Sequence, residues 1–379
     1  MIELNFTIFS LLLSIAFIIA LTFGFLLLFS RHENKKADHF LALLMFVVAL
    51  WNASILILLL NIHRYAVGII WVPLTYTLAL GPCFYFYIRY MTGTGFNQNL
   101  KIWPHFIPVF FQVLIFLIEV FQGIPLRQGY FETEMFLIFD PFVNGLSIVS
   151  LMVYGYLARK RIQNYHQWVE NNYSHYHRYN LNWLFRFSTV FMMFLALWLC
   201  YFLIDYFLFN YKLTFFDYYP FHLTLAIISI WLSVEAFSKP DVIYSDRKIK
   251  LKTDNNSSSL ADDELQQKAS WLKHQIEQNL LYLDPELSLK SLAETLSIHP
   301  NLASRIINDG LQQTFSDCIN HYRVEAVSKK LKNHNNDQST FLAIAFDCGF
   351  NSKTTFNRVF KKHTGKTPQQ YRSNLNNIH

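Results

Sequence analysis

A series of long apolar runs between residues 5 and 237 restricts this chain's fold more than any other feature of its sequence. A helix that crosses a bilayer needs about 20 mostly apolar residues. Seven runs satisfy this: approximately Asn5–Ser30, Phe40–Ile62, Ala66–Tyr90, Ile102–Gln122, Met135–Tyr156, Leu184–Phe209 and Phe215–Phe237. They contain almost no interior charge, and membrane helices tolerate the prolines found in several of them. The runs therefore predict seven membrane-spanning helices instead of a water-soluble bundle.

The composition changes sharply near Pro240. Hydrophobic residues make up 53% of the chain and charged residues 15%, although a soluble domain has roughly 25% charged residues. The hydrophobic excess lies before Pro240, whereas the later sequence is rich in Lys, Asn, Ser and Gln. We therefore predict an all-α protein with a transmembrane domain at residues 1–238, a linker and amphipathic helix at 239–282, and a soluble domain at 283–379.

Basic residues predict the orientation of the spans. In a seven-span arrangement with a cytoplasmic C-terminal part, ten Lys and Arg residues fall on the inner side and three on the outer side. The inner ten are Arg31, Lys35, Lys36, Arg89, Lys101, Arg159, Lys160, Arg161, Arg178 and Arg186, and the outer three are Arg64, Arg127 and Lys212. This bias follows the positive-inside rule. The first basic cluster also follows the first apolar run, as in a membrane anchor with an external N-terminus and unlike a signal peptide. The sequence thus predicts a multi-pass protein of the cytoplasmic (inner) membrane.

Cysteine spacing and side-chain chemistry give no sign of a catalytic or metal centre. The four cysteines, Cys83, Cys200, Cys318 and Cys348, form no CxxC pair and no Cys/His cluster. We therefore expect reduced, packed thiols, with no disulfide, zinc site or cofactor. Paired carboxylates, an HExxH motif and a Ser/His set are not apparent within the spans, so we do not expect an enzyme.

Two distinct segments follow the last apolar run. Residues Ser238–Ser259 hold Lys, Asp, Asn and Ser with few large apolar side chains, which is typical of a flexible tether. Residues Leu260–Tyr282 then place apolar side chains on one helical face: Leu265, Ala269, Leu272, Ile276 and Leu280. This face could form a short dimer seam or pack against the domain that follows, and the sequence leaves both alternatives open.

The last 95 residues repeat one helical pattern twice. Leu289, Leu292, Ala293 and Leu296 have the spacing i, i+3, i+4, i+7, and after a short turn Pro300 suits the first position of a second helix, which stops at Asp309-Gly310. A longer helix at Thr314–Leu331 follows. The spacing then recurs at Phe341, Ile344, Ala345 and Cys348, and Ser352 can cap a helix over Lys353–His363 that ends at Gly365. The pattern predicts two helix-turn-helix units joined by a stiff helix.

Two sequence segments make the resemblance to a known family specific. They are Ile344–Lys362, with the sequence IAFDCGFNSKTTFNRVFKK, and Gly365–Arg372, with the sequence GKTPQQYR. Together with Leu289–Leu296, Ser304-Arg305, Phe315, Tyr322-Arg323 and Ala326, they resemble the AraC/XylS family of bacterial transcription regulators. The sequence departs from the family pattern at Ala303 and Ile307, where the family usually has Leu and Phe. The apolar part resembles, by architecture alone, the multi-helix sensor region of some members.

The resemblance implies double-stranded promoter DNA and RNA polymerase as partners. The residues that it implies for base contact are Asn301, Ser304, Arg305, Lys353, Thr354, Asn357 and Arg358. Arg suits guanine and Asn suits adenine in the major groove, although Arg305 and Arg358 could instead hold phosphate. Lys361, Lys362 and Lys366 are expected to contact phosphate. Residues 285–379 carry twelve Lys and Arg against seven Asp and Glu, a balance that suits a polyanion.

Acidic and aromatic residues at similar outer depth suggest a place where a signal could enter. The candidate pocket consists of Glu119, Asp140, Asp205, Asp217, Tyr218 and His222. Charges within a bilayer are costly and usually face a cavity or a partner. A cationic or polar, partly apolar small molecule or envelope signal would fit such a pocket. The alternative is that these side chains simply lie in the interface with water, among an aromatic belt.

Three functions remain open from the sequence. In the first, the lipid-embedded part senses a signal and the helix-turn-helix units, as a monomer or a homodimer, regulate a promoter. In the second, the membrane part is a transporter or membrane enzyme whose tail regulates its own gene. In the third, the chain is a membrane scaffold whose helix-turn-helix units bind protein. Transporters usually show internal repeats and midplane charges, which are not evident here, so we favour the first.

Overall fold

The computed structural model describes residues 7–30, 34–60, 62, 68–69, 72–93, 101–122, 134–174, 181–210, 213, 215–238, 262–333 and 340–376. Over these residues the chain is almost entirely helical, which confirms the all-α fold class. The chain divides into two compact units. The N-terminal unit comprises Met1–Gln163 and Leu181–Lys248, and the C-terminal unit comprises Asn164–Asn180 and Ile249–His379.

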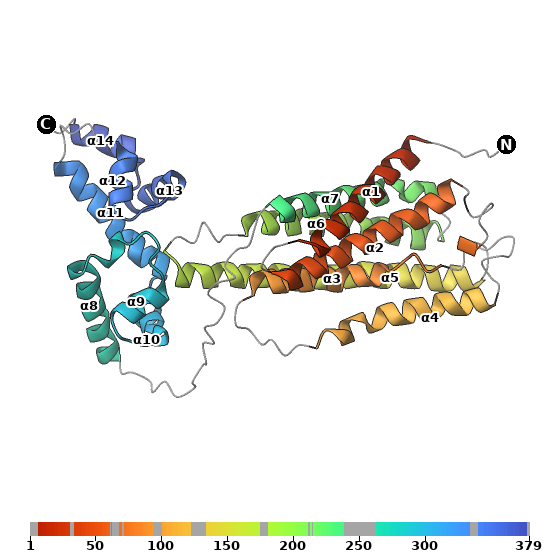
Figure 1. The fold of residues 1–379 in the computed structure, drawn as a ribbon, viewed down its shortest axis with the longest axis horizontal. Helices are drawn as coiled ribbons and strands as arrows, with labels where there is room; N and C mark the ends of the chain where they lie inside the picture. The colour runs from red at the N-terminus through yellow and green to blue at the C-terminus, as the bar shows by residue number, and fades with distance from the viewer. Residues whose placement is uncertain are drawn as a thin grey trace. The chain divides into compact units, whose positions relative to one another are not determined.

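The N-terminal unit is a bundle of antiparallel helices (Figure 1). Its elements are α1 (Ile8–Leu28), α2 (Lys35–Leu59), α3 (Thr77–Thr92), η3 (Trp103–Phe106), α4 (Ile107–Phe121), the first part of α5 (Glu134–Asn172), α6 (Asn182–Leu208), η7 (Phe215–Tyr218) and α7 (Tyr219–Ser238). Helix α2 packs against α1, α3 and α7, and α7 also contacts α1 and α6. Helix α2 therefore lies at the centre of this group.

Six helical segments in the described residues are long and apolar enough to cross a membrane, as judged by length and composition. They include α1, α2, α6 and α7, the joined η3–α4 segment and most of α5. The expected third span is shorter, because α3 begins at Thr77 and has 16 residues, or about 24 Å at 1.5 Å per residue. Residues 72–76, which include Pro73, are not helical. The count of seven spans therefore stays a prediction.

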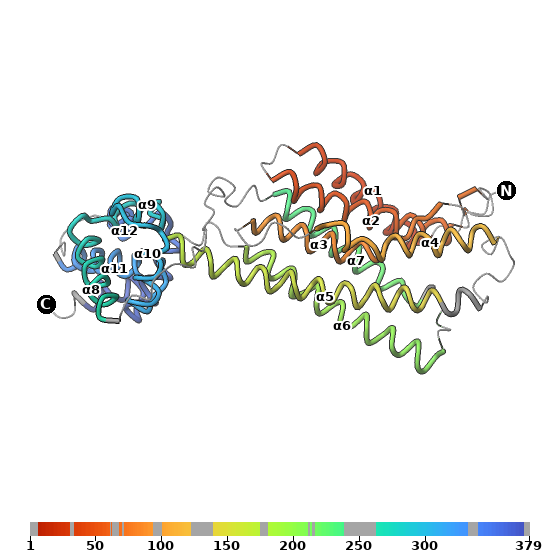
Figure 2. Tube along the Cα trace, turned by 90° about the horizontal axis from the view of Figure 1, so that it is seen from below, coloured from red at the N-terminus to blue at the C-terminus, as the bar shows by residue number. Residues whose placement is uncertain are grey.

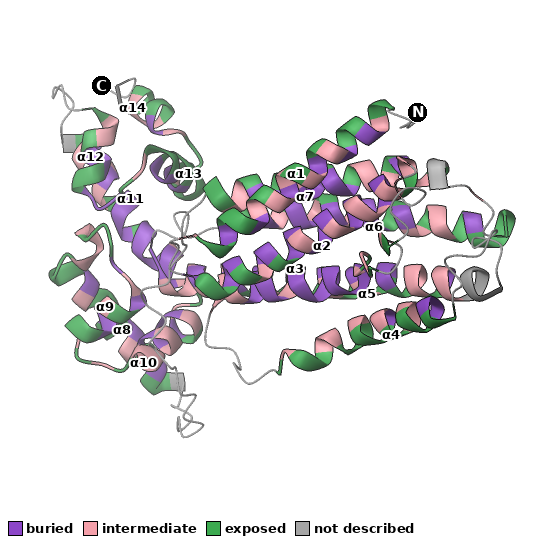
Figure 3. Ribbon diagram, turned by 45° about the vertical axis from the view of Figure 1, so that its right-hand side comes forward, coloured by how far each residue is buried: buried purple, intermediate pink, exposed green. Residues whose placement is uncertain are grey.

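Large apolar side chains cover the outer surface of this bundle. In α4 the exposed fractions are 66% for Phe110, 55% for Phe111 and 87% for Phe121, and in α6 Leu208 is 73% exposed. Figure 3 shows such exposed positions along the outward faces of α1 and α4. A water-soluble monomer rarely exposes apolar patches of more than a few hundred Å², so this surface suits an apolar surrounding.

Buried polar groups connect the ends of three helices of the bundle. Asn34 accepts a hydrogen bond from the backbone N–H of Ala37 and donates one to the carbonyl of Tyr90 at 2.8 Å. The Arg161 guanidinium donates to the Thr92 hydroxyl at 3.1 Å. These contacts join α2, α3 and α5 at the end of the bundle that carries the basic residues.

The C-terminal unit contains two small cores that share one long helix. Its elements are α8 (Asp262–Gln278), η8 (Leu281–Leu283), α9 (Leu289–Thr295), α10 (Pro300–Arg305), η9 (Ile306–Gly310), α11 (Phe315–Asn333), α12 (Phe341–Asp347), α13 (Lys353–Thr364) and α14 (Pro368–Asn376). Phe315, Ile319 and Tyr322 of α11 belong to the first core, whereas Val324 and Val327 belong to the second. Helix α11 therefore connects the two helix-turn-helix units, as the sequence predicted. Helices α8 to α12 form a compact group in Figure 2.

Helix α8 packs on the first helix-turn-helix unit. Leu265, Ala269, Leu272 and Ile276 are each at most 8% exposed and belong to the first core. Leu280, the last member of the expected apolar face, lies beyond the helix with a positive φ of 49° and is 48% exposed. Of the two alternatives for this helix, the structure supports packing within the chain, because the apolar face is already covered.

Candidate DNA-binding interface

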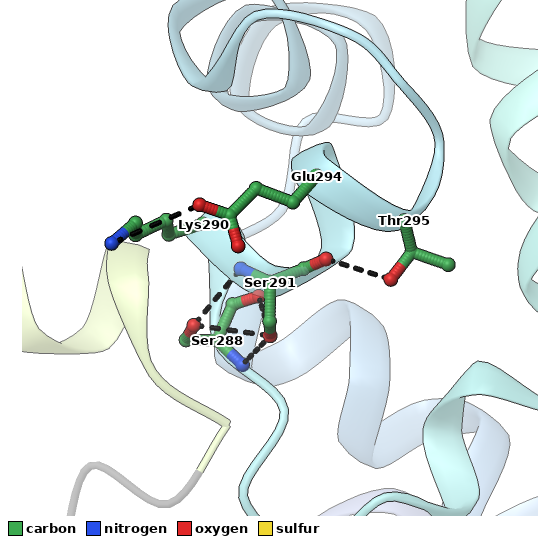
Figure 4. A network of polar contacts seen from close by, with 5 residues as sticks. All are labelled: Ser288, Lys290, Ser291, Glu294 and Thr295. Carbon is green, nitrogen blue, oxygen red and sulfur yellow. Dashed lines mark hydrogen bonds and ion pairs between the residues drawn. The ribbon is translucent and has the colours of Figure 1, made fainter.

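The first helix-turn-helix begins with a reciprocal cap at Ser288, which Figure 4 shows in close view. The Ser288 hydroxyl accepts a hydrogen bond from the Ser291 backbone N–H at 3.1 Å, and the Ser291 hydroxyl accepts one from the Ser288 N–H at 2.9 Å. These bonds satisfy backbone donors that a helix start leaves open. On the exposed face, Lys290 lies 3.8 Å from Glu294, four residues on. The cap fixes the point at which α9 begins.

The turn and second helix of this unit follow the predicted sequence signals. His299 accepts a hydrogen bond from the Asn301 N–H at 3.2 Å, and Pro300 occupies the first helical position of α10. Ala303 and Ile307, the two departures from the family pattern, are 0% and 1% exposed. They therefore affect packing and leave the outer face of the helix to other residues.

Three predicted base-contacting residues lie on the partly exposed face of α10, namely Asn301, Ser304 and Arg305. The Ser304 hydroxyl accepts a hydrogen bond from the Asn308 side chain at 3.1 Å. The Arg305 guanidinium lies 3.9 Å from the Asp309 carboxylate. Binding of DNA to Ser304 and Arg305 would compete with these two interactions. Base contact by the three residues stays a prediction.

The second recognition helix, α13, has two distinct faces. Ser352 caps it by accepting a hydrogen bond from the Thr355 N–H at 3.1 Å, and Gly365 ends it with a φ of 73°. Its buried face holds Thr355, Phe356, Val359 and Phe360, which belong to or adjoin the second core. The opposite, exposed face carries the other predicted base readers and a basic neighbour: Lys353, Thr354, Asn357, Arg358 and Lys361. This side of α13 presents hydrogen-bond donors and positive charge to solvent.

The three residues predicted to contact phosphate differ in their surroundings. Lys361 and Lys366 are exposed. Lys362 instead donates a hydrogen bond of 2.6 Å to the Asp317 carboxylate of α11. Because this ion pair joins α13 to α11, Lys362 has a structural partner that the sequence pattern did not suggest. Its contact with phosphate stays a prediction.

Arg323 is a residue whose role the sequence did not show. It is 0% exposed, and its guanidinium donates to the carbonyls of Tyr282 at 2.8 Å and Asp284 at 2.7 Å. It also lies 6.0 Å from the ring centre of Phe350 in the second core. Burial lowers its pKa to about 10, so the side chain is still protonated at neutral pH. Arg323 thus connects the two cores.

Gly349 is required where the second turn passes this arginine. Its φ is 88°, and a Cβ atom there would lie 2.4 Å from the Tyr282 carbonyl oxygen and 3.0 Å from the Arg323 side chain. A larger residue here would push the second turn away from the Tyr282 carbonyl and the Arg323 side chain, within the C-terminal unit.

The candidate signal pocket is only partly brought together. Asp205 is 1% exposed and accepts hydrogen bonds from the Tyr218 hydroxyl at 2.5 Å and the Leu213 N–H at 3.2 Å. The Tyr201 hydroxyl donates to the backbone carbonyl of Asp217 at 3.3 Å. These contacts connect α6 with the start of α7. Both carboxylate oxygens of Asp205 are thus engaged within the chain.

The remaining pocket candidates have separate surroundings. Asp140 accepts a hydrogen bond of 2.8 Å from Asn144, one turn further along α5, and Glu119 is buried near the end of α4. His222 packs edge-on against Trp51, with 5.2 Å between ring centres. The pocket therefore remains a prediction, with Asp205 and Tyr218 as the pair in direct contact.

Among the described residues, no group of three or more His, Cys, Asp or Glu side chains is placed to hold a metal ion. The four cysteines are free thiols: Cys83, Cys318 and Cys348 are buried, whereas Cys200 is exposed. Burial raises the pKa of the Cys318 thiol to about 12, which keeps it protonated at neutral pH.

In comparisons with known proteins, the C-terminal part of the chain matches helix-turn-helix proteins. Residues 292–374 match the family described as "Helix-turn-helix domain". An uncharacterized HTH-type transcriptional regulator of Staphylococcus aureus (strain MSSA476) is 31% identical over 118 residues, which is 31% of this chain and 14% of that protein. No solved structure matches the chain.

Two Escherichia coli (strain K12) proteins match the same part. The melibiose operon regulatory protein is 32% identical over 89 residues, 24% of this chain and 28% of its own length. The uncharacterized HTH-type transcriptional regulator YijO is 30% identical over 86 residues, 23% of this chain and 29% of its own length. The chain thus matches less than a third of the length of these relatives. Residues 292–374 form an AraC-type helix-turn-helix domain.

Proposed function

We propose that this chain is a membrane-embedded transcription regulator that binds promoter DNA through its two helix-turn-helix units and responds to a signal received by its helical bundle. One observation carries the proposal. Two capped recognition helices, α10 and α13, are joined by α11 in the same chain as a bundle whose outer surface is apolar.

The exposed face of α13 supports DNA binding. Asn357, Arg358 and Lys361 lie on one side of a helix whose other side is fixed in a core. Side chains of this kind can reach base edges and phosphates from a helix lying in the major groove. A helix of 19 residues between the units, about 28 Å long, suits two grooves about one DNA turn apart. The relatives' names as transcriptional regulators agree with this use.

The apolar helices and the loop charges support the membrane part of the proposal. The chain would lie in the cytoplasmic membrane as a multi-pass protein with its N-terminus outside and its DNA-binding part in the cytoplasm. The polar sequence between the parts predicts a tether of about 20 residues with a span of roughly 25 Å. We therefore expect operator DNA to come to the membrane. A small molecule or envelope signal, RNA polymerase and a second copy of the chain are the remaining proposed partners.

Selection of genomic fragments tests DNA binding directly. The full-length chain, reconstituted in lipid nanodiscs, is incubated with sheared DNA of its own genome, and the retained fragments are sequenced. We expect a few promoter regions with a shared motif to be enriched. The matched control is the double variant N357A/R358A, which should retain DNA without sequence preference. Equal recovery of fragments by both proteins would reject the proposal.

A further inference from the structure

Helix α5 is longer than a membrane span requires. Its 39 residues correspond to about 58 Å at 1.5 Å per residue, whereas the hydrocarbon core is about 30 Å thick. The basic residues Arg159, Lys160 and Arg161 lie within it, and 11 residues remain between Arg161 and the helix end at Asn172. Residues 164–180 count with the C-terminal unit, although the helix begins in the N-terminal unit. One continuous helix thus contributes to both units.

Within the C-terminal unit, the residues just after α5 contact the start of the first helix-turn-helix. Tyr173 forms an antiparallel bridge with Ser288, and the Ser174 N–H donates to the Leu287 carbonyl at 3.3 Å. The Ser174 hydroxyl also donates to this carbonyl at 2.7 Å. These contacts lie at the cap of α9, where the first helix-turn-helix begins.

The same residues also contact α11. The Ser174 carbonyl accepts hydrogen bonds from the Ser316 hydroxyl and the Asn320 amide, both at 3.3 Å. The Arg323 guanidinium donates to the Ser174 hydroxyl at 3.2 Å. Ser174, Ser316, Asn320 and Arg323 are all at most 2% exposed. A polar group in such surroundings is costly to leave without its partner, so the contact is specific.

We propose that the cytoplasmic end of α5, residues 164–174, is the coupling element of this protein: it docks on α11 and the cap of α9, and thereby holds the two helix-turn-helix units in the arrangement that binds an operator. The proposal rests on the proposed function, because it assigns the path by which that function is regulated.

Arg323 explains why docking of α5 would affect both helix-turn-helix units. The same guanidinium that binds Ser174 also holds the carbonyls of Tyr282 and Asp284 and lies against Phe350 of the second core. Recognition helices α10 and α13 belong to different cores, and an operator needs them in fixed relative positions. Docking would set these positions before DNA arrives, and preorganisation of this kind raises affinity. A movement of α5 in the membrane would then alter DNA binding without passing through the tether.

Thiol crosslinking tests the docking in the full-length chain. We would introduce S174C and S316C in a C200S background, which removes the exposed native thiol, and oxidise the protein in nanodiscs. The matched control pairs S174C with E325C, because Glu325 is exposed and nine residues further along α11, on its opposite face. We expect the peptide containing residues 174 and 316 to be crosslinked in most molecules and the control pair in few. Equal yields would overturn the docking.

Operator affinity then tests the coupling, with the enriched genomic fragment as the probe. We expect N320A, which removes one donor to Ser174, to weaken operator binding at least about fivefold, and the 174–316 crosslink in the same variant to restore it. Hydrogen exchange in α13 checks that the second helix-turn-helix unit stays folded. If operator affinity is unchanged after both the substitution and the crosslink, the coupling is wrong and the contact between α5 and α11 has only a structural role.

The proposed function and the proposed coupling can be rejected independently of each other. If the wild-type chain enriches no genomic sequence, the proposed function is rejected, while the crosslinking yield still decides whether α5 docks. If the operator is found but N320A and the crosslink leave its affinity unchanged, the regulator stands and the coupling element is rejected.

Discussion

At the scale of single residues, Arg323 holds the C-terminal unit together from its interior. It is the largest fully buried side chain among the described residues. The R323M variant keeps most of the volume but leaves the Tyr282 and Asp284 carbonyls without their donor. We expect each orphaned carbonyl to cost about 1–3 kcal/mol. Faster hydrogen exchange along α11 of the full-length chain would measure this loss.

A lysine on the same helix provides the control for that prediction. Lys329 is exposed on α11, so K329M should leave the exchange rates within the first core unchanged. If R323M and K329M had the same small effect, the buried guanidinium would not be a structural link.

The exposed residues of the recognition helices predict a different kind of effect. Replacing Arg305 or Arg358 by Ala should weaken operator binding by about 1–3 kcal/mol if each contacts a guanine through two hydrogen bonds. Replacing Lys361 by Ala should weaken binding to all DNA about equally and lower the salt slope by about one. Titration of operator and scrambled DNA at several salt concentrations separates the two cases. Unchanged sequence preference in both Arg variants would make these residues phosphate contacts.

Sequence reasoning at this scale succeeded where a residue acts on its own local chain. Pro300 and Ser352 lie where their helix-starting and capping preferences place them. It failed where the role depends on distant partners. Arg323 and Ser174 are 149 residues apart, and no local pattern reveals that they meet.

At the scale of elements, helix α8 is part of the first helix-turn-helix core. Leu272 is 0% exposed within that core, whereas its neighbour Trp271 is 38% exposed. The L272A variant should therefore destabilise the unit by about 2–5 kcal/mol through lost contact and a cavity, while W271A should have little effect. Hydrogen exchange in α9 and α11 measures the difference. A change in oligomeric state alone, with unchanged exchange, would instead favour a dimer seam.

Element boundaries show what the sequence could and could not predict. Local signals predicted the starts of α10 and α13, because Pro300 suits the first helical position and the Ser352 hydroxyl bonds to the adjacent turn. The helical stretch that begins with α10 ends at Gly310 with η9, as expected, but the geometry of its end differs. Asp309-Gly310 was expected to form the C-terminal cap, but the φ of Gly310 is not positive, and its lack of a side chain allows α8 to approach. A Cβ atom there would lie 3.2 Å from the Cβ of Ala269.

Apolar runs predicted that spans exist but not how long each helix is. The third run was expected to be helical from Ala66, although α3 begins at Thr77, after Pro73. The fifth was expected to end near Tyr156, although α5 continues to Asn172 through a polar stretch. Hydropathy measures transfer to lipid, so it cannot follow a helix that continues into water.

At the scale of the whole molecule, the charge distribution predicts one topology. Reporter domains fused after Ile62, Gln128 and Lys212 should be active outside the membrane, and those after Lys36, Asn164 and Ser245 should be active inside. Enzymatic reporters that function on one side of the membrane provide the measurement. Two or more reversed results would contradict the seven-span arrangement. Reversal of the two fusions that precede α3, after Lys36 and after Ile62, would indicate that α3 does not span the membrane.

The central claim is that one molecule reads DNA while it is embedded in a membrane. The most direct measurement is to crosslink DNA to the full-length protein in living cells, isolate the membrane fraction, and sequence the DNA recovered with the protein. We expect a few promoter regions to be recovered with the membrane and to be lost in the R305A/R358A variant. Recovery of the protein outside the membrane fraction, or of the same DNA with the variant, would contradict it.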